Sequence, residues 1–99
     1  MTAGNGDRVG HDAGERGGVF FLERGGRRIA ELTYKLEGRD AVVDYTWVDP
    51  QLRGGGIARP LFEAIVAWAR GEDRKLHPTC YYARGVFDRN PAYDDVRRR

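Results

Sequence analysis

The hydrophobic and polar positions of this chain follow first the period of a β-strand and then that of an α-helix. Residues 19–23 form a short β-favouring run that ends at a Gly-Gly turn. Residues 30–36 and 42–48 then alternate between apolar and polar side chains, as half-buried strands do. The apolar positions of these two runs are Ala30, Leu32, Tyr34 and Leu36, followed by Val43, Tyr45 and Trp47. The pattern predicts an antiparallel meander whose strands are joined by polar turns.

A helical period follows the predicted meander. Strand pairing is expected to end at Asp49-Pro50, because proline cannot donate to a strand ladder. The apolar side chains of residues 57–70 cluster on one side at about 100° per residue, which predicts an amphipathic helix packed on the sheet. Its apolar face holds Ile57, Leu61, Ile65 and Trp68, with Ala58, Phe62 and Ala69 beside them. Gly71 is expected to end the helix, and Pro60 fits if regular bonding begins later or if the first turn is widened.

The last third of the chain predicts one more strand and a short helix. Residues 76–83 have a strand pattern in which Pro78 marks an edge or the point where pairing stops. A strand, a helix and another strand in this order predict a right-handed crossover and a parallel strand pair. Residues 84–96 carry a weak helical pattern that is interrupted at Asn90-Pro91. The expected fold class is α/β in the broad sense (α+β), a meander followed by a β-α-β crossover and a short C-terminal helix.

Both ends of the chain lack this regular pattern. Residues 1–17 contain several glycines among polar residues and no apolar period, which predicts a disordered tail that includes His11. Residues 97–99, all arginine, are expected to form a solvated, mobile basic tail; the alternative is that they attract an anionic partner. Residues 18–96 are then a single domain, since a chain of 99 residues is too short to divide into separate cores.

The composition is that of an ordinary globular protein, with 40% hydrophobic and 32% charged residues. No stretch has the length of a membrane span, and the N-terminus lacks the pattern of a secretory signal. Cys80 is the single cysteine, so an internal disulfide is excluded and a cytoplasmic location is expected. A formal net charge of +2 does not by itself indicate nucleic-acid binding.

The candidate chemistry lies in the loop Arg53-Gly54-Gly55-Gly56-Ile57-Ala58, between the end of a predicted strand and the start of the predicted helix. Backbone N–H groups at a helix N-terminus have no intrahelical partner, and the helix dipole adds about half a positive charge there. Glycines let the backbone approach an anion closely, and Arg53 can add a charge-assisted contact. These features suit a pyrophosphate, whereas a flexible turn would not need this position.

Other phosphate-binding motifs do not fit this loop. It lacks the lysine followed by serine or threonine that a P-loop requires. A dinucleotide-binding fold would need a longer alternating α/β chain and an acidic residue after a second strand. No metal site is predicted.

Residues 48–58, Val-Asp-Pro-Gln-Leu-Arg-Gly-Gly-Gly-Ile-Ala, resemble the acetyl-CoA motif of GCN5-related N-acetyltransferases, an Arg/Gln-x-x-Gly-x-Gly/Ala pattern after a strand. Arg53, Gly56 and Ala58 fill its specified positions. The chain is similar in particular to a minimal branch of that superfamily, which has a downstream Pro-x-Cys. The matching segments are Pro78-Thr79-Cys80, then Tyr81-Tyr82 and Asn90-Pro91-Ala92-Tyr93, and the resemblance covers residues 19–96.

The chain departs from that branch at two positions and in one whole region. Tyr45-Thr46 stands where the branch often has His-Thr, and Pro60 is unusual in the helix. The helices with which larger members build an acceptor pocket are missing, so the resemblance does not identify the acceptor.

The resemblance implies a minimal acetyltransferase fold in which acetyl-CoA lies between splayed parallel strands, 42–48 and 76–83. It implies that the pantetheine arm bonds to strand backbone near Val48. The other implied cofactor-binding residues are Arg53, Gly54, Gly55, Gly56, Ile57, Ala58 and Arg59. It also places Cys80 beside the thioester, where a thiolate could take the acetyl group and pass it on. The alternative is that Cys80 is a small buried hydrophobic residue, as free cysteines often are.

Other candidate catalytic groups are less specific. His77 points away from Cys80 if both lie in one strand, so a surface or structural role is expected for it. The side chains of Tyr45, Trp47, Tyr81 and Tyr82 are expected to be sheet aromatics, and any hydroxyl among them could protonate a leaving thiolate. Asp44, Glu31 and Glu37 show no pairing that suggests acid–base work.

Three functions are compatible with these patterns. The first is an acetyl-CoA-dependent N-acetyltransferase that acts on a small-molecule or peptide amine. The second is a module that binds coenzyme A without turnover. The third, weaker, is an anion- or nucleic-acid-binding domain that uses the arginines, although no stacking-aromatic motif accompanies them. The chain is expected to be a monomer or a weak homodimer without a membrane partner.

Overall fold

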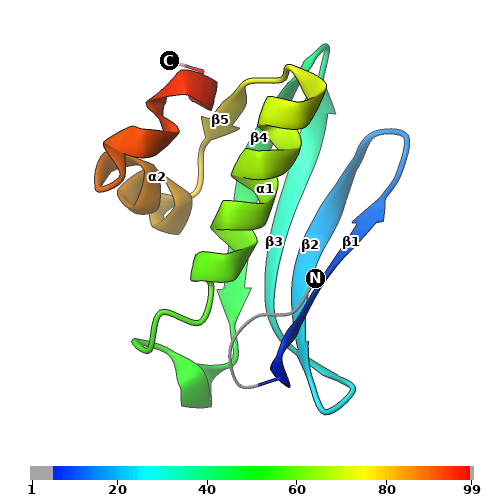
Figure 1. Ribbon diagram of the computed structural model, residues 1–99, viewed down its shortest axis with the longest axis vertical. Helices are drawn as coiled ribbons and strands as arrows, with labels where there is room; N and C mark the ends of the chain where they lie inside the picture. The colour runs from blue at the N-terminus through cyan, green and yellow to red at the C-terminus, as the bar shows by residue number, and fades with distance from the viewer. Residues whose placement is uncertain (1–5, 99) are drawn as a thin grey trace.

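The computed structural model describes residues 6–98 as one mixed sheet with helices packed against it (Figure 1). The strands lie in the order β1-β2-β3-β4-β5; every neighbouring pair is antiparallel except β4 and β5, which are parallel. The strands are β1 (Arg8–Ala13), β2 (Gly17–Arg24), β3 (Arg27–Glu37), β4 (Asp40–Val48) and β5 (Leu76–Pro78). The helices are α1 (Arg59–Glu72) and α2 (Tyr81–Asp88), with short 3₁₀ helices at Pro50–Leu52 and Pro91–Val96. The predicted fold class is confirmed.

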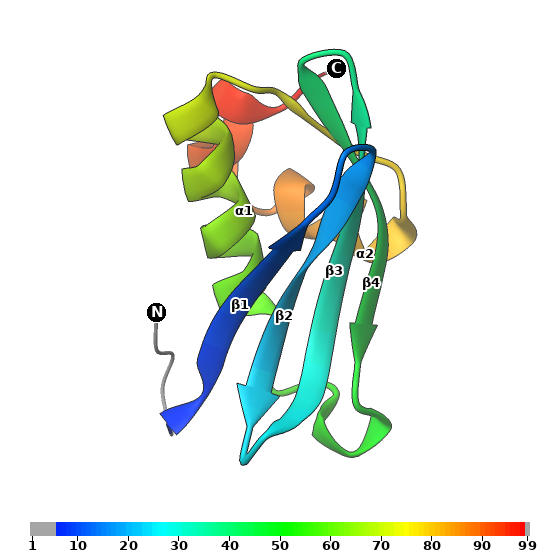
Figure 2. The same cartoon turned by 90° about the vertical axis from the view of Figure 1, so that its right-hand side faces the viewer.

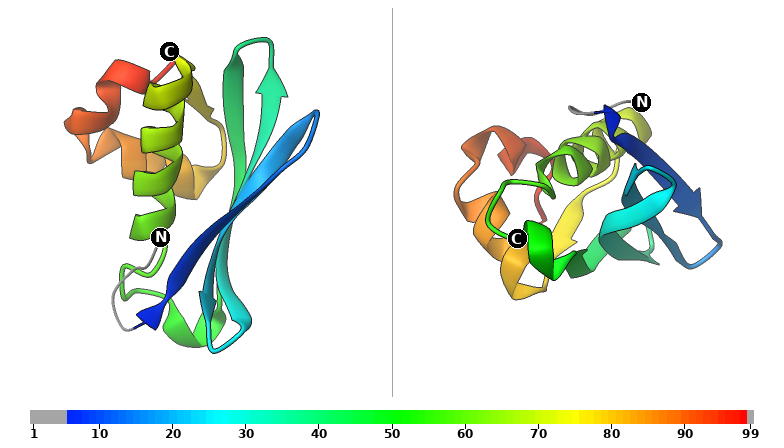
Figure 3. Two further views of the ribbon diagram at one scale, coloured as in Figure 1. Left: turned by 45° about the vertical axis from the view of Figure 1, so that its right-hand side comes forward. Right: turned by 90° about the horizontal axis from the view of Figure 1, so that it is seen from below.

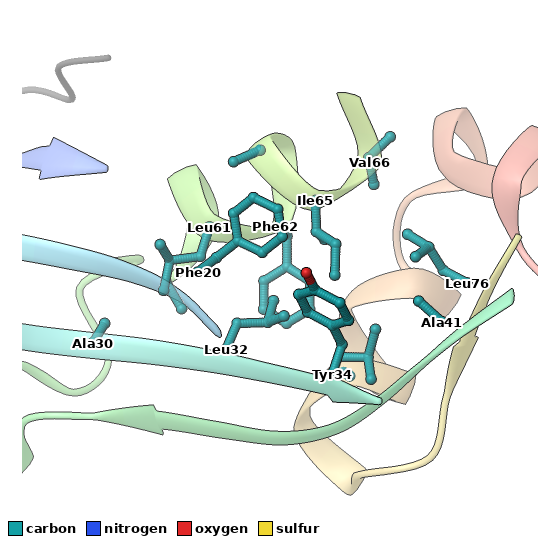
Figure 4. Packing of buried hydrophobic residues seen from close by; sticks show 14 of the residues in the cluster. Phe20, Ala30, Leu32, Tyr34, Ala41, Leu61, Phe62, Ile65, Val66 and Leu76 are labelled. Atoms are coloured by element: carbon teal, nitrogen blue, oxygen red, sulfur yellow. The ribbon is translucent and has the colours of Figure 1, made fainter. Parts of the chain in front are cut away.

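Helix α1 covers one face of the sheet, and α2 lies beyond β5 (Figures 1 and 3). No helix of residues 6–98 covers the opposite face of β1 to β4 (Figure 2). Large apolar side chains of α1 meet those of the strands between the layers (Figure 4). The fully or nearly fully buried members of this core include Phe20, Leu32 and Tyr34 from the sheet and Leu61, Phe62 and Ile65 from α1. The two apolar faces that the sequence predicts therefore form one core.

Strand β1 corrects the prediction that residues 1–17 are disordered; residues 1–5 of that segment lie outside the described residues. Arg8 to Ala13 pair with β2 in continuous antiparallel register. A Cβ atom on Gly10 would stand 2.2 Å from the ring of Phe21, so glycine is required at this strand position by close approach. The glycines that suggested disorder thus serve packing, which a single-sequence pattern does not reveal.

His11 belongs to an aromatic cluster at the edge between β1 and α1. Its ring stacks on Phe20 with centroids 3.9 Å apart, and its Nε2 lies 2.6 Å from the hydroxyl of Tyr34. Trp68 of α1 packs edge-on against the His11 ring at 5.6 Å. Burial lowers the pKa of His11 below its ordinary value and raises the pKa of Tyr34. His11 therefore ties β1 to the core instead of lying in a tail.

His11→Gln is expected to destabilise the fold by about 1–2 kcal/mol, through loss of ring stacking and of a hydrogen bond. Because the folded protein depresses the pKa of His11, protonation favours the unfolded chain. Wild-type stability should fall as the pH drops below about 6.5, and the slope should be smaller in His11→Gln. Urea unfolding at pH 7.5 and 5.5 measures both effects; equal slopes in the two proteins would contradict the assignment.

A β-bulge at Asp44 changes which side chains of β4 face the core. The register between β3 and β4 shifts by one residue at this point, so the alternation of side chains reverses beyond it. Thr46 therefore shares the core face with Val43, and Tyr45 is 51% exposed. The prediction that Tyr45 and Trp47 lie on the same face as Val43 was wrong, because strict alternation holds only in a regular ladder.

Strand β5 is shorter than predicted. Its pairing with β4 ends at Pro78, as the proline suggested, but the chain then turns and enters α2 at Tyr81. The predicted strand 76–83 is therefore wrong after Pro78. Strand β4 continues to Val48 without a partner on this side, so the parallel strands part at Val43 (Figure 1).

Helix α1 begins and ends one or more residues later than predicted. Its N-cap is Ala58 and Pro60 lies in the first turn, where no backbone N–H is needed, so regular bonding begins later and the turn is not widened. Gly71 lies inside the helix, and Asp73 ends it in the left-handed conformation at φ 56°. Arg39 donates to the carbonyl of Glu72 at 2.6 Å, so a distant side chain satisfies the helix end.

The predicted mobile tail 97–99 is also corrected for its described residues, Arg97 and Arg98. Arg97 forms a parallel bridge with Leu76, and the backbone N–H of Arg98 donates to the Leu76 carbonyl at 2.7 Å. Their guanidinium groups form ion pairs with carboxylates of other elements, namely Asp88, Glu37 and Asp40. These arginines extend the edge of the sheet beyond β5.

Candidate functional site

The end of β4 is held by the carboxylate of Asp49. Its Oδ1 accepts from the backbone N–H of Gln51 at 3.0 Å, and its Oδ2 accepts from Arg27 at 2.8 Å. The Gln51 N–H and then Arg27 lower the pKa of Asp49 below its ordinary value. Asp49 thereby caps the 3₁₀ helix that leads into the glycine loop. The sequence prediction used only Pro50 at this point, although an aspartate directly before a proline is a recognised cap pattern.

The loop 53–58 has the backbone geometry of an anion-binding loop. Gly54 and Gly56 have φ values of 87° and 72°, in the left-handed region that glycine adopts without strain. The backbone N–H groups of residues 54–58 donate to no described residue. They directly precede α1, whose dipole places about half a positive charge at that end. An anion at this position would receive hydrogen bonds from groups that otherwise have no partner in the described part of the chain.

Arg53 folds back onto the strand end. Its Nε donates to the carbonyl oxygen of Val48 at 3.0 Å. This contact fixes the loop against β4 and leaves the remaining N–H donors of the guanidinium available. Arg53 therefore connects the two parts of the predicted site, the strand end and the loop.

A cavity of about 470 Å³ opens between β4, the loop and α2. Its lining residues are Thr46, Val48, Leu52, Arg53, Gly54, Gly56, Ile57 and Tyr82. The cavity lies where β4 and β5 part, as the sequence predicted for the cofactor. Three predicted cofactor-binding residues do not line it: Gly55, Arg59, and Ala58, whose side chain is fully buried.

A second cavity, of about 240 Å³, adjoins the first and shares Gly56 and Tyr82 with it. Arg59, the last predicted cofactor residue, lines this cavity, with its side chain 3.4 Å from Glu63. Arg89 also lines it, and its guanidinium has no partner among the described residues. The sequence prediction considered Arg89 only as part of a general basic surface. Arg89 directly precedes Asn90-Pro91, which belongs to one of the segments that match the minimal branch of the superfamily. This position is the sequence signal for Arg89.

Cys80 caps the N-terminus of α2 instead of lying in a strand. Its Sγ accepts from the backbone N–H of Ala83 at 3.3 Å and lies 3.6 Å from the hydroxyl of Thr46. Thr46 lines the larger cavity, so the thiol stands directly behind the cavity wall. The sequence prediction placed Cys80 correctly at the parting of the strands, and the bulge at Asp44 is what turns Thr46 toward it.

The structure separates the aromatic candidates. Tyr82 lines both cavities and stacks on Phe62 at 5.9 Å, whereas Tyr81 is 94% exposed and Tyr45 lies on the far face of β4. His77 forms no hydrogen bond with Cys80, and its Nδ1 is buried without a partner in the described structure. Of the predicted tyrosine candidates, Tyr82 is therefore the one that faces both cavities, and Tyr93 lines the smaller one.

Two further findings concern the described residues as a whole. None of their helices has the length and hydrophobicity needed to cross a membrane. Their His, Cys, Asp and Glu side chains form no group of the kind that holds a metal ion.

A meander, a parallel pair that parts and a glycine-rich loop before α1 define the acetyltransferase-like α/β fold. Residues 19–96 match the family model described as GCN5-related N-acetyl-transferase. The chain belongs to this family.

Relatives and solved structures agree with this assignment. Protein NATD1 of Xenopus tropicalis is 35% identical over 86 residues, which cover 85% of this chain and 77% of that protein. Human Protein NATD1 is 35% identical over 85 residues, which cover 85% and 74%. A GCN5-like protein of Staphylococcus aureus superposes with a TM-score of 0.71 at 26% identity, covering 90% of this chain and 87% of that one.

One similar structure contains the expected cofactor. A GNAT family acetyltransferase of Elizabethkingia anophelis with acetyl-CoA bound superposes with a TM-score of 0.68, covering 90% of this chain and 75% of that one. Its sequence identity is 10%, so the likeness concerns the fold alone.

Proposed function

We propose that the protein binds acetyl-CoA and transfers its acetyl group to an amine. The observation that carries this proposal is the row of unpartnered N–H groups of residues 54–58 beside the cavity at the strand end. The pyrophosphate would be held by this row, which includes Gly55 and Ala58 through their backbone, and by the charge of Arg53. Val48 and Ile57 line the cavity that would take the pantetheine arm.

The nucleotide end of the cofactor would occupy the adjoining smaller cavity. Coenzyme A carries a phosphate on its ribose in addition to the pyrophosphate. Arg59 and Arg89 supply positive charge on the wall of this cavity, and Arg89 has no competing partner among the described residues. Arginine binds phosphate with several donors at once, which makes both side chains suitable for it.

For the transfer step, Cys80 is proposed as the nucleophile and Tyr82 as the proton donor. The sulfur lies at the N-terminus of α2 and accepts one N–H there, an arrangement that stabilises negative charge on it. Attack on the thioester carbonyl forms a new carbon–sulfur bond and releases the cofactor thiolate, which Tyr82 can protonate. The amine then attacks the acetyl-cysteine, the Cys80 thiolate leaves, and the proton lost by the amine returns to the Tyr82 oxygen. Direct attack of the amine on the thioester is the competing route.

A coenzyme A-binding module without turnover is the second candidate. No carboxylate or imidazole lines the larger cavity, so the described residues provide no evident general base within it. Release of free thiol from acetyl-CoA in the presence of candidate amines distinguishes a transferase from such a module. A screen of primary amines with this readout also addresses the acceptor.

Coenzyme A is expected to raise the melting temperature. A ligand that binds the folded state alone stabilises it by about 2.7 kcal/mol at a hundredfold excess over Kd, which corresponds to about 11–22 °C in a domain of this size. Thermal unfolding with coenzyme A, acetyl-CoA and pantetheine tests this, and pantetheine, which lacks the pyrophosphate, should produce a smaller shift. An unchanged transition with millimolar coenzyme A and no heat of binding would refute the proposal.

A further inference from the structure

A third cavity, separate from the cofactor site, is lined by three arginines. It has a volume of about 370 Å³ and lies at the edge of the sheet beyond β5. Its lining residues are His77, Pro78, Thr79, Arg84, Arg97 and Arg98, and they are called the arginine pocket below. None of these residues lines the larger cofactor cavity.

The arginine pocket and the cofactor cavity approach Cys80 from different sides. Leu76 and Pro78 of β5 are buried in the core, so His77 between them projects from the opposite face of the sheet. Thr79, the residue before Cys80, lines the arginine pocket. Thr46, whose hydroxyl lies 3.6 Å from the Cys80 sulfur, lines the cofactor cavity. The segment 78–80 is therefore the wall that separates the two cavities.

The pocket offers hydrogen-bond donors and charge that the protein does not use. The guanidinium of Arg84 forms no hydrogen bond or ion pair with a described residue. The Nδ1 atom of His77 has no partner among the described residues, but it is buried and out of reach of a ligand in the pocket. The exposed guanidinium of Arg84 is therefore the group suited to an oxygen-rich anion.

The other two arginines are partly neutralised. Arg97 pairs with Asp88 at 2.8 Å, and Arg98 pairs with Glu37 at 2.8 Å and with Asp40 at 3.1 Å. Asp88 and Glu37 are largely exposed, so water and salt screen them, whereas Asp40 is only 27% exposed and neutralises Arg98 more fully. Each guanidinium has five N–H donors, and these ion pairs leave some of them for a ligand. Arg84 is thus the uncompensated charge, and the paired arginines surround it.

We propose that the arginine pocket binds a carboxylate or phosphate group of the acetyl acceptor. The inference rests on the proposed function, because it defines the chemistry of the molecule that receives the acetyl group. Acetyl transfer requires the acceptor amine and the acetyl group to be held close together and correctly oriented. Cys80, the proposed acetyl carrier, belongs to the wall between the two cavities, so an acceptor anchored in the arginine pocket would meet the acetyl group on this side chain. The acceptor is therefore an amine that carries an anionic group.

Anion binding is tested first, without any acetyl transfer. Inorganic phosphate and succinate are titrated at constant ionic strength, and backbone and arginine side-chain NMR signals are followed by residue. Saturable shifts are expected at Thr79 and Arg84. Arg84→Gln should lower the anion affinity that these shifts report by about tenfold or more, since it removes a charge-assisted contact. The control is Arg8→Gln, which removes the same charge from β1, where Arg8 pairs with Glu23; it should leave binding unchanged.

Acceptor selection is tested next with amines matched except for charge. O-phosphoethanolamine is compared with ethanolamine, and β-alanine with β-alaninamide, by the release of free thiol from acetyl-CoA. The anionic member of at least one pair is expected to have a kcat/KM about tenfold higher or more, and the pair identifies phosphate or carboxylate as the group. Arg84→Gln should remove the difference, while Arg8→Gln should keep it.

The outcomes separate this inference from the proposed function. Acetylation of charged and neutral amines at equal rates would overturn the inference and leave the transferase standing. Coenzyme A binding without transfer to any amine would overturn the transferase and with it the acceptor role. In that case the anion titration still tests whether the arginine pocket binds anions. The absence of saturable shifts at Thr79 and Arg84 would show that no anion site exists there.

Discussion

Gly56→Val is expected to abolish coenzyme A binding while leaving the protein folded. Gly56 has a φ of 72°, which a β-branched residue adopts only with a strain of about 1–3 kcal/mol. A Cβ at this position would meet no protein atom within 4 Å, so it would point into open space at a residue that lines both cofactor cavities. The valine side chain would obstruct a phosphate. Relief of the backbone strain would also turn the N–H groups of residues 54–58 away from the phosphate. Affinity should fall by about a hundredfold or more, as loss of charge-assisted hydrogen bonds implies.

A matched variant separates the backbone effect from the site effect. Gly38 lies in the turn between β3 and β4 with a φ of 62°, and a Cβ there also meets nothing within 4 Å. Gly38→Val should therefore lose about the same stability, about 1–3 kcal/mol, and bind coenzyme A normally. Calorimetric titration and urea unfolding of both variants provide the comparison. Wild-type affinity in Gly56→Val would mean that residues 53–58 form only a turn.

Cys80→Ser is expected to eliminate acetyl transfer while coenzyme A affinity is retained. Serine is a good N-cap, so it can replace the sulfur as acceptor of the Ala83 N–H and keep α2 in place. Serine lacks a readily formed anionic nucleophile, however, and turnover should fall by at least about a hundredfold if the thiolate carries the acetyl group. Wild-type protein incubated with acetyl-CoA and no amine should gain one acetyl mass, and hydroxylamine should remove it.

Cys80→Ala distinguishes the competing route. Alanine removes both the nucleophile and the cap, so a modest loss of stability, about 1 kcal/mol, accompanies this variant whatever the mechanism. If it keeps most of the wild-type rate, the amine attacks the thioester directly and Cys80 is a packing and capping residue. Catalysis would then come from proximity and from polarisation of the carbonyl.

Much of the fold follows from the sequence alone. The alternation in residues 30–36 and the helical period in residues 57–70 depend on neighbouring positions in the chain, so a short window contains their signal. The glycine loop was located because it lies between two such elements. Pro78 marked the end of pairing in β5 because a missing N–H donor is a local property. These patterns were enough to predict the fold class and the place where the two parallel strands part beside a cavity.

Other features were decided by contacts between distant residues. Strand β1 forms because Gly10 admits the ring of Phe21 and because His11 stacks on Phe20, and neither partner is near in sequence. The bulge at Asp44 arises in the pairing of β4 with β3 and has no counterpart in the alternation of β4 itself.

The transfer site and the arginine pocket depend on the tertiary structure most of all. Cys80 caps a helix beside Thr46 because β5 stops and the bulge has turned Thr46 toward the core face. Arg84 and Arg97 line one cavity because the chain returns along β5 after α2. The spacing of apolar residues shows whether a segment is a helix or a strand. Which side chains of different elements come into contact depends on strand register, on where strands end and on packing. The sequence therefore determined most of the elements and the position of the glycine loop, and only the folded chain determined which side chains surround the proposed site.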